Sequence, residues 1–188
     1  MSGFRITPIE VLVVVLCLFL VAVLVVPAIL MSREESRSLT CQSHQVDLVL
    51  ALRAQIDQEA IDNPIHWPEQ LAKHLKEPSI IEHCPSDERW PPTVSSYGIN
   101  GLVAQFSERN SETIIFIDYN ALVVLLNGGD VVSQWKEMVA PRHFEFVNAA
   151  FYDSHIELKD PASIAPGEAN GAHFWMPQEM RNSGLSNE

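Results

Sequence analysis

The chain is 188 residues long and carries a formal net charge of −12, which argues against partners that are themselves acidic, such as nucleic acid or anionic lipid headgroups. Every basic residue except Arg5 and every acidic residue except Glu10 follows an N-terminal apolar run. The part of the chain after this run therefore carries the whole negative charge. It is long enough for one domain with an ordinary core and too short for two.

The most informative segment is the apolar run from Val11 to Met31, which contains no charged or amide side chain. At about 1.5 Å per helical residue it spans about 30 Å, the thickness of the hydrocarbon core of a bilayer. A secretory signal has an apolar stretch of only about 7–15 residues followed by a small-residue cleavage site, and this sequence has neither. We therefore predict a retained single-pass anchor, with the lipid bilayer as its first partner.

Helical periodicity continues beyond the anchor. Apolar residues between Leu39 and Ala60 recur mostly at three- and four-residue steps, with acidic and amide residues elsewhere on the helical wheel. We predict one helix from about Thr7 to about Ala60, kinked near Pro27 and stopped by the Asp-Asn-Pro of residues 62–64.

The rest of the sequence predicts a second short helix and several strands. The helix is expected from Pro68 to Lys76, and single strands at 80–81, 97–106 and 112–118. Turn signals predict two hairpins, one joining 123–126 to 131–132 and one joining 146–152 to 155–158. Residues 86–96, which include Trp90, are expected to form an ordered loop, and the chain from Pro161 onward a tail with little packing.

These elements indicate an α+β fold in which a long kinked N-terminal transmembrane helix packs, in its outer half, on a small antiparallel β-sheet. The predicted organisation is a short leader-like segment (1–10), a transmembrane helix (11–31), a globular domain (32–160) and a C-terminal tail (161–188).

The three cysteines help to place the domain relative to the membrane. Cys17 lies within the apolar run and is expected to behave as a small hydrophobe, which leaves Cys41 and Cys84 outside the bilayer. Two cysteines in a small extracytoplasmic domain favour one disulfide, whereas in the cytosol they would more often be free thiols. Such a bond is expected to stabilise the fold by roughly 4 kcal/mol in the chain-entropy description.

A kinked membrane-spanning helix that continues into a small sheet domain resembles the type IV pilins and type II secretion pseudopilins. In that superfamily a Gly-Phe processing site precedes a glutamate and an apolar helix, and Gly3, Phe4, Glu10 and Pro27 occupy comparable places here. The resemblance implies that Glu10 pairs with the N-terminal amine of a neighbouring subunit during assembly. The alternative is that Glu10 lies at the membrane interface, favoured by the positive end of the helix dipole.

The chain is more specifically similar to a planctomycete-type pseudopilin-like family that carries a processing-associated His-x9-Asp-Gly motif. The family has glycines after the motif histidine and after the motif aspartate, and this chain has Phe144, Glu145 and Ser154 at those places. The motif residues that match are Cys84, Pro85, Ser86 and Asp87; Tyr97, Gly98 and Asn100; and His143, Asn148 and Asp153.

One cluster has metal-ligand chemistry, because imidazole and carboxylate groups suit zinc and related ions. It consists of His143, Asp153 and His155. The favoured interpretation is structural, with Asp153 shaping a turn and His143 bonding to backbone at the sheet edge. We expect no cofactor, and the sequence identifies no small-molecule substrate.

No catalytic motif is present, whether a Gly-x-Ser-x-Gly elbow, a glycine-rich phosphate loop or a His-Glu-x-x-His helix. The sequence therefore predicts no enzyme. It predicts a pseudopilin-like structural subunit of the cell inner membrane, with a periplasmic domain, that assembles with homologous pseudopilins or with secretion or pilus assembly proteins. The alternative is a monomeric membrane-tethered binding module that presents its sheet or the loop around Trp90 to a ligand.

Overall fold

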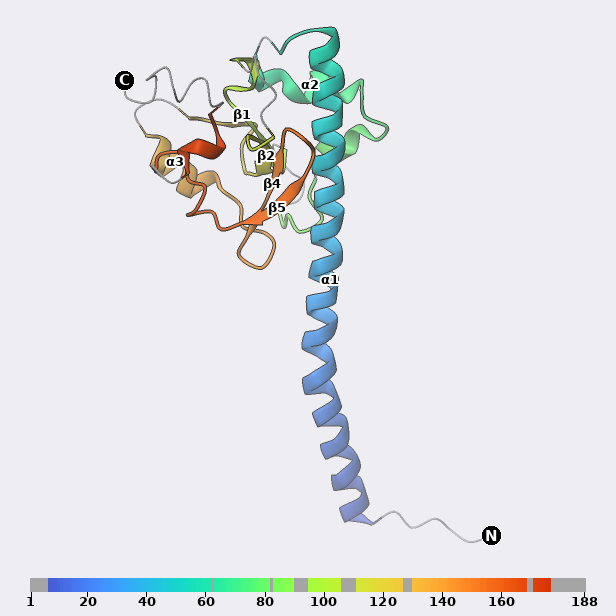
Figure 1. Ribbon diagram of the computed structural model, residues 1–188. Coiled ribbons are helices and arrows are strands. Elements are labelled where there is room, and N and C mark those ends of the chain that lie inside the picture. The colour runs from blue at the N-terminus through green and yellow to red at the C-terminus, as the bar shows by residue number, and fades with distance from the viewer. Residues whose placement is uncertain are drawn as a thin grey trace. The chain divides into compact units, whose positions relative to one another are not determined.

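The computed structural model of the protein describes residues 7–61, 63–81, 83–89, 95–105, 111–126, 130–168 and 171–176. The chain separates into two compact units, Met1–Ser36 and Arg37–Glu188. One α-helix, α1 (Pro8–Gln58), contributes its first residues to the first unit and its remaining residues to the second (Figure 1).

Helix α1 confirms the prediction of one long N-terminal helix to within two residues at each end. Pro27 lies in its interior, and the helix continues on both sides of it. Within the first unit the described side chains of α1 are exposed almost throughout, whereas in the second unit one face of the helix is buried. The buried face consists of Ser38, Cys41, Gln45, Leu48, Val49, Ala51, Leu52 and Gln55.

The second unit contains a five-stranded mixed sheet with the strand order β3-β1-β2-β4-β5. Its strands are β1 (Tyr97–Asn100), β2 (Ile114–Asp118), β3 (Val123–Val124), β4 (Val147–Phe151) and β5 (Ile156–Lys159). Strands β1 and β2, β2 and β4, and β4 and β5 pair antiparallel, but β1 and β3 pair parallel. The α+β class and the β4–β5 hairpin are confirmed, whereas the expectation of a purely antiparallel sheet is wrong at β3.

The predicted hairpin joining 123–126 to 131–132 is also wrong. Val131 and Val132 begin helix α3 (Val131–Met138), whose Trp135 packs between Tyr119 and Trp175 at ring-centroid distances of 5.9 and 5.6 Å. Burying this indole outweighs the strand preference of two adjacent valines. The expected glycine turn falls at 127–129, outside the described residues.

Three smaller differences concern element lengths. The predicted strand at 80–81 is part of a 3-10 turn, Pro78–Ile81, in which both isoleucines are buried. The predicted helix 68–76 is present but shorter, as α2 (Trp67–Ala72), and it follows a 3-10 turn, Pro64–His66. Strand β1 ends at Asn100, and a 3-10 turn, Val103–Gln105, follows it. In the two strand cases, a compact turn buries the apolar side chains as well as an extended strand would.

The sheet is covered on both faces. On one face α1 and α2 pack against Tyr97, Ile99 and Phe116, and on the other α3 and the C-terminal segment pack against Ile117 and Phe151 (Figure 1). A register irregularity between Ile114 and Phe116 places Ile115 and Phe116 in the same core cluster, although they are neighbours in one strand. Both faces of the central strands are therefore shielded from solvent, which explains the unbroken apolar run at 114–117.

The C-terminal segment corrects another expectation. Ile164 and Trp175 are completely buried, the Trp175 indole N–H donates to the carbonyl oxygen of Ile164 at 2.6 Å, and the Trp175 carbonyl accepts from Asn100 Nδ2 at 2.9 Å. Residues 161–168 and 171–176 thus contribute Ile164, Ala165 and Trp175 to the core and are not a loosely packed tail. The residues from 177 onward lie outside the described part.

Candidate functional site

The first feature with functional meaning is the apolar part of α1. It is long and apolar enough to cross a membrane, and none of its most apolar window is buried. At its start the backbone N–H of Thr7 donates to Glu10 Oε2 at 2.7 Å, and the backbone N–H of Glu10 donates back to the Thr7 carbonyl at 3.1 Å. The glutamate thus satisfies a donor that a helix end leaves unpaired, as in a capping box. Gly3 and Phe4 lie outside the described residues.

The second feature is the disulfide between Cys41 and Cys84, whose Cα atoms are 5.4 Å apart. It joins α1 to the segment that precedes β1, and both cysteines are completely buried. This confirms the predicted pair. Cys17 is a free cysteine and is exposed on α1.

Beside the disulfide lies a buried polar cluster centred on Asp118, the last residue of β2. Its Oδ1 accepts from Gln45 Nε2 of α1 at 3.0 Å, and its Oδ2 accepts from the backbone N–H of Asn148 at 2.7 Å. His143 Nε2 lies 3.7 Å from the same Oδ2 and 3.5 Å from Cys84 Sγ. Burial raises the pKa of Asp118 to about 6, against the opposing effects of His143 and of the hydrogen bond from Asn148.

A charged pair closes the cluster on the side of Asp87. Arg142, whose side chain is 8% exposed, lies with Nη2 3.0 Å from Asp87 Oδ2 and donates through Nη1 to the Ser96 carbonyl at 2.7 Å. Asp87 also accepts from Arg89 Nη2 at 2.6 Å and from Ser96 Oγ at 2.7 Å. Burial opposes the charge on Asp87, but these hydrogen bonds and the Arg142 guanidinium outweigh it and hold the pKa of Asp87 well below its usual range.

The Tyr-Gly-x-Asn residues position the strands around this cluster. Tyr97 Oη lies 3.4 Å from Cys41 Sγ and 3.2 Å from His44 Nδ1. A Cβ atom on Gly98 would lie 2.8 Å from the Tyr119 ring, so only glycine allows that approach. Asn100 Nδ2 donates to the carbonyls of Ile114 and Trp175 at 2.8 and 2.9 Å. We conclude that this motif holds β1 against its neighbours.

The remaining motif residues are also placed by local bonds. Pro85 and Ser86 occupy a turn in which the backbone N–H of Asp87 donates to the Cys84 carbonyl at 2.8 Å. Asn148 Oδ1 accepts from Gln42 Nε2 of α1 at 3.1 Å, which ties β4 to the helix.

The predicted metal-ligand set is divided between two places. Asp153 and His155 lie on the exposed β4–β5 turn, where Asp153 Oδ1 accepts from the backbone N–H of His155 at 3.1 Å and also contacts its ring Nδ1. This agrees with the turn-shaping role expected for Asp153. His143 is completely buried and belongs to another group, in which the ligand atoms of Cys41, Cys84, Asp118 and His143 lie within 4.8 Å of one another.

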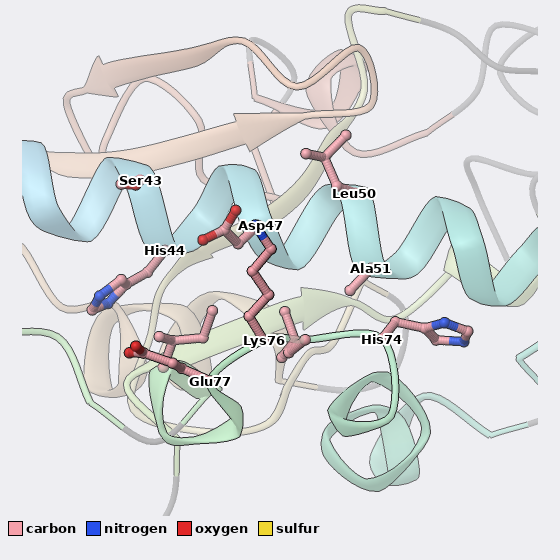
Figure 2. Close-up of a pocket in the computed structure, with 10 residues that line it drawn as sticks. Ser43, His44, Asp47, Leu50, Ala51, His74, Lys76 and Glu77 are labelled. Carbon is pink, nitrogen blue, oxygen red and sulfur yellow. The ribbon is translucent and has the colours of Figure 1, made fainter.

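An open cleft of about 530 Å³ lies between α1 and the segment 74–80 (Figure 2). His44 and Asp47 line it from α1, and His74, Lys76 and Glu77 line it from the other side. Burial lowers the pKa of His44, and this effect outweighs the opposing effects of a backbone hydrogen bond and of the nearby carboxylates. The cleft therefore offers both charge signs to a ligand without a dominant field.

The sequence interpretation did not single out Gln45, Asp118 or Arg142. The signal for Gln45 is its place on the buried face of α1, between Cys41 and Leu48, where an amide needs a buried partner. Asp118 ends an isoleucine-rich strand. A carboxylate at that position also needs a buried partner, but the sequence indicates its burial less clearly than that of Gln45. Arg142 gives no signal in the sequence, because its partners come from distant segments.

Comparisons of the chain with protein-family models, with curated proteins and with solved structures return no match. The class that its own architecture defines is an α+β domain, closed by a buried disulfide, on a long apolar N-terminal helix.

Proposed function

We propose that this chain is a single-pass membrane protein that serves as a pseudopilin-like structural subunit, with its acidic domain outside the cytoplasm. The observation that carries the proposal is the apolar surface of α1. From Val11 to Met31 every side chain is exposed, yet the same helix buries one face against a sheet from Ser38 onward. A surface of this size needs lipid or other helices around it.

The backbone gives independent support for the pseudopilin-like family. Among the described residues, the non-glycine residues with positive φ are Phe144, Glu145 and Ser154, at 54°, 69° and 77°. These are the positions at which the resembled family carries glycine, the residue that adopts this conformation without strain. The left-handed backbone at these three places is the conformation that the glycines of the resembled family would adopt without strain.

The disulfide of the domain supports an extracytoplasmic location. Disulfides persist in oxidising compartments, and the Cys41–Cys84 bond lies in the core of the domain. The proposal gives the protein a structural role, carried by helix–helix packing in the bilayer and by display of the domain.

Membrane extraction and protease protection test the anchor and its orientation. We expect the full-length chain to stay in the pellet after alkaline carbonate treatment and to dissolve in detergent. Protease added to spheroplasts with intact inner membranes should cleave the domain. Release by carbonate alone, or cleavage only after the membranes are opened, would contradict the anchor or the orientation, respectively.

Cys17 offers a direct test of assembly, because it is a free cysteine exposed on the anchor helix. We expect a short bis-maleimide reagent to join two copies through Cys17 in native membranes, and a Cys17→Ser chain to give no dimer. Moving the thiol one position, in a Cys17→Ser/Leu18→Cys chain, rotates it by about 100° around the helix and should lower the yield if one face is used. Equal yields at both positions would indicate random collision.

The cleft in Figure 2 favours the second candidate, a monomeric tethered binding module. The two candidates differ at the native N terminus and in subunit number. Mass spectrometry of a processed, N-methylated start supports assembly, whereas an intact start together with a monomeric mass in detergent supports the tether.

A further inference from the structure

The disulfide cysteines belong to a second grouping besides their own bond. The Sγ atoms of Cys41 and Cys84, an oxygen of Asp118 and a ring nitrogen of His143 lie within 4.8 Å of one another, and all four side chains are buried. They come from α1, from the segment before β1, from the end of β2 and from the segment before β4. Two sulfurs, an imidazole and a carboxylate around one point form the donor set of a tetrahedral zinc site.

We propose that the reduced form of the domain binds one zinc-class divalent ion through Cys41, Cys84, Asp118 and His143. In the oxidised domain the two sulfurs are bonded to each other and are not available as thiolates. A dithiol reductant supplies two electrons and two protons to the bond, which gives two thiols and the oxidised, cyclic reductant. Metal binding then releases the two thiol protons. The same residues thus close the core either by a covalent bond or through an ion.

The surroundings of the site suit a metal ligand at Asp118. Gln45 Nε2 and the backbone N–H of Asn148 already fix its two carboxylate oxygens, at 3.0 and 2.7 Å, as outer partners fix a ligating carboxylate. Tyr97 Oη, 3.4 Å from Cys41 Sγ, can donate to a thiolate there. These contacts hold the Asp118 carboxylate in place before any ion arrives, and the two sulfurs move apart when the bond between them is reduced.

Charge balance also favours an ion in the reduced state. Two thiolates and a carboxylate buried together would repel one another, and a divalent cation leaves a single negative charge. The buried guanidinium of Arg142 interacts electrostatically with Asp118 and offsets that charge. Without the ion the two cysteines would have to remain protonated.

The burial of all four ligands determines how the ion enters. A site with no exposed ligand is loaded as the chain folds, so the free energy of metal binding is added to that of folding. The folded oxidised domain should therefore take up no metal at this place, and the reduced chain should fold more readily when the metal is present.

The experiment uses the full chain in detergent with Cys17→Ser, so that Cys41 and Cys84 are the remaining cysteines. The protein is unfolded, reduced with a phosphine, and refolded without oxygen in the presence or absence of Co²⁺. We expect one Co²⁺ per chain, with thiolate-to-cobalt charge-transfer absorption, tetrahedral d–d bands and recovery of the near-ultraviolet circular dichroism. Zn²⁺ should displace Co²⁺ and abolish these absorption bands, and the oxidised chain should show no such bands.

Variants separate the four-residue site from unspecific thiol binding. Asp118→Asn should weaken Co²⁺ binding about tenfold or more, whereas Asp153→Asn, on the exposed turn, should bind as the parent does. If Asp118→Asn does not fold, the comparison of the oxidised and reduced parent still decides. A reduced chain that neither refolds with Co²⁺ nor shows tetrahedral bands overturns the proposal, and so does unchanged affinity in a folded Asp118→Asn chain.

Discussion

The two parts of helix α1 have the same secondary structure but gain their stability from different surroundings. In the first unit the large apolar side chains are about half exposed or more, for example Leu20 at 54% and Leu24 at 73%. In the second unit the leucines of the buried face, Leu48 and Leu52, have no exposed surface. Leu39 and Leu50 of the same helix remain 60% and 50% exposed on its other side. The first part needs apolar surroundings on every side, whereas the second needs a packing partner on one face only.

This difference predicts that a substitution will act on one unit and leave the other unchanged. Such a separation follows from the proposed anchor, because the second unit has a packed core and a disulfide of its own, while the first unit would depend on lipid. The following tests are ordered by the size of the expected effect.

The largest effect is expected for Trp175→Ala in the core of the second unit. The indole is completely buried, packs edge-on against Trp135 and donates to the Ile164 carbonyl. Its loss should lower the free energy of unfolding by about 3–5 kcal/mol, measured by urea unfolding in detergent with near-ultraviolet circular dichroism. Phe146→Ala, at a 42% exposed ring, is the control and should change it little. Membrane extraction should not change, and altered extraction would show that the units are coupled.

Leu20→Arg should change membrane extraction and leave the free energy of unfolding of the second unit unchanged. A guanidinium near the centre of the apolar run should cost about 3 kcal/mol of insertion free energy and increase the carbonate-extractable fraction. The matched control is Leu39→Arg, an exposed leucine of the same helix in the second unit, which should insert as the parent does. Equal behaviour of the two variants would contradict the division of α1 into a lipid-facing and a domain-packed part.

The sequence predicts the elements whose pattern is local. The apolar run, the ends of α1 and the β4–β5 hairpin each depend on neighbouring residues, and all three agree with the structure. Two features depend on distant partners and were not predictable. Val131 and Val132 read as strand because the signal for α3 is the burial of Trp135 against Trp175, forty residues further on. The parallel pairing of β3 with β1 likewise has no signature in a two-residue strand.

The candidate site divides in the same way. The pairing of Cys41 with Cys84 followed from counting the cysteines outside the apolar run. The metal-capable group was missed because Asp118 and His143 meet only through the β2–β4 pairing, whereas the sequence offered Asp153 and His155 as nearer neighbours. Sequence spacing thus identifies candidate ligands that share one turn, but not candidate ligands that come together from segments distant in the sequence.

The pH dependence of the second unit should report on Asp118. Folding raises its pKa from 3.8 to about 6, so the neutral carboxyl favours the folded state. The resulting stabilisation of the folded state, about 3 kcal/mol, is fully present below pH 3.8 and is lost as the pH rises through 6. The groups that face it are His143, Arg142, Gln45 and Asn148. Asp118→Asn should remove this fall in unfolding free energy, and Asp153→Asn should retain it. An identical slope in all three chains would contradict the assignment.

A smaller effect, an increase in stability rather than a loss, is expected for Glu145→Gly. Glu145 is exposed and has φ of 69°, a conformation that costs an L-residue about 1 kcal/mol and glycine almost nothing. The variant should therefore raise the free energy of unfolding of the second unit by about 1 kcal/mol. Glu157→Gly, in strand β5, is the control and should lower it. A destabilised Glu145→Gly chain would show that the side chain has a role that outweighs the strain.

The smallest effect is expected at the start of α1, where Glu10 accepts the Thr7 N–H. Glutamine at the same position of a capping box also reaches this donor, so Glu10→Gln should keep the helix start and alter helicity in detergent very little. Glu10→Ala removes the acceptor and should loosen the helix start, seen as faster amide hydrogen exchange at the first turn. Glutamine retains the cap but not the charge, so a loss of Cys17 crosslinking in Glu10→Gln would assign the carboxylate a role between subunits. Unchanged crosslinking in that variant would instead restrict Glu10 to the helix that contains it.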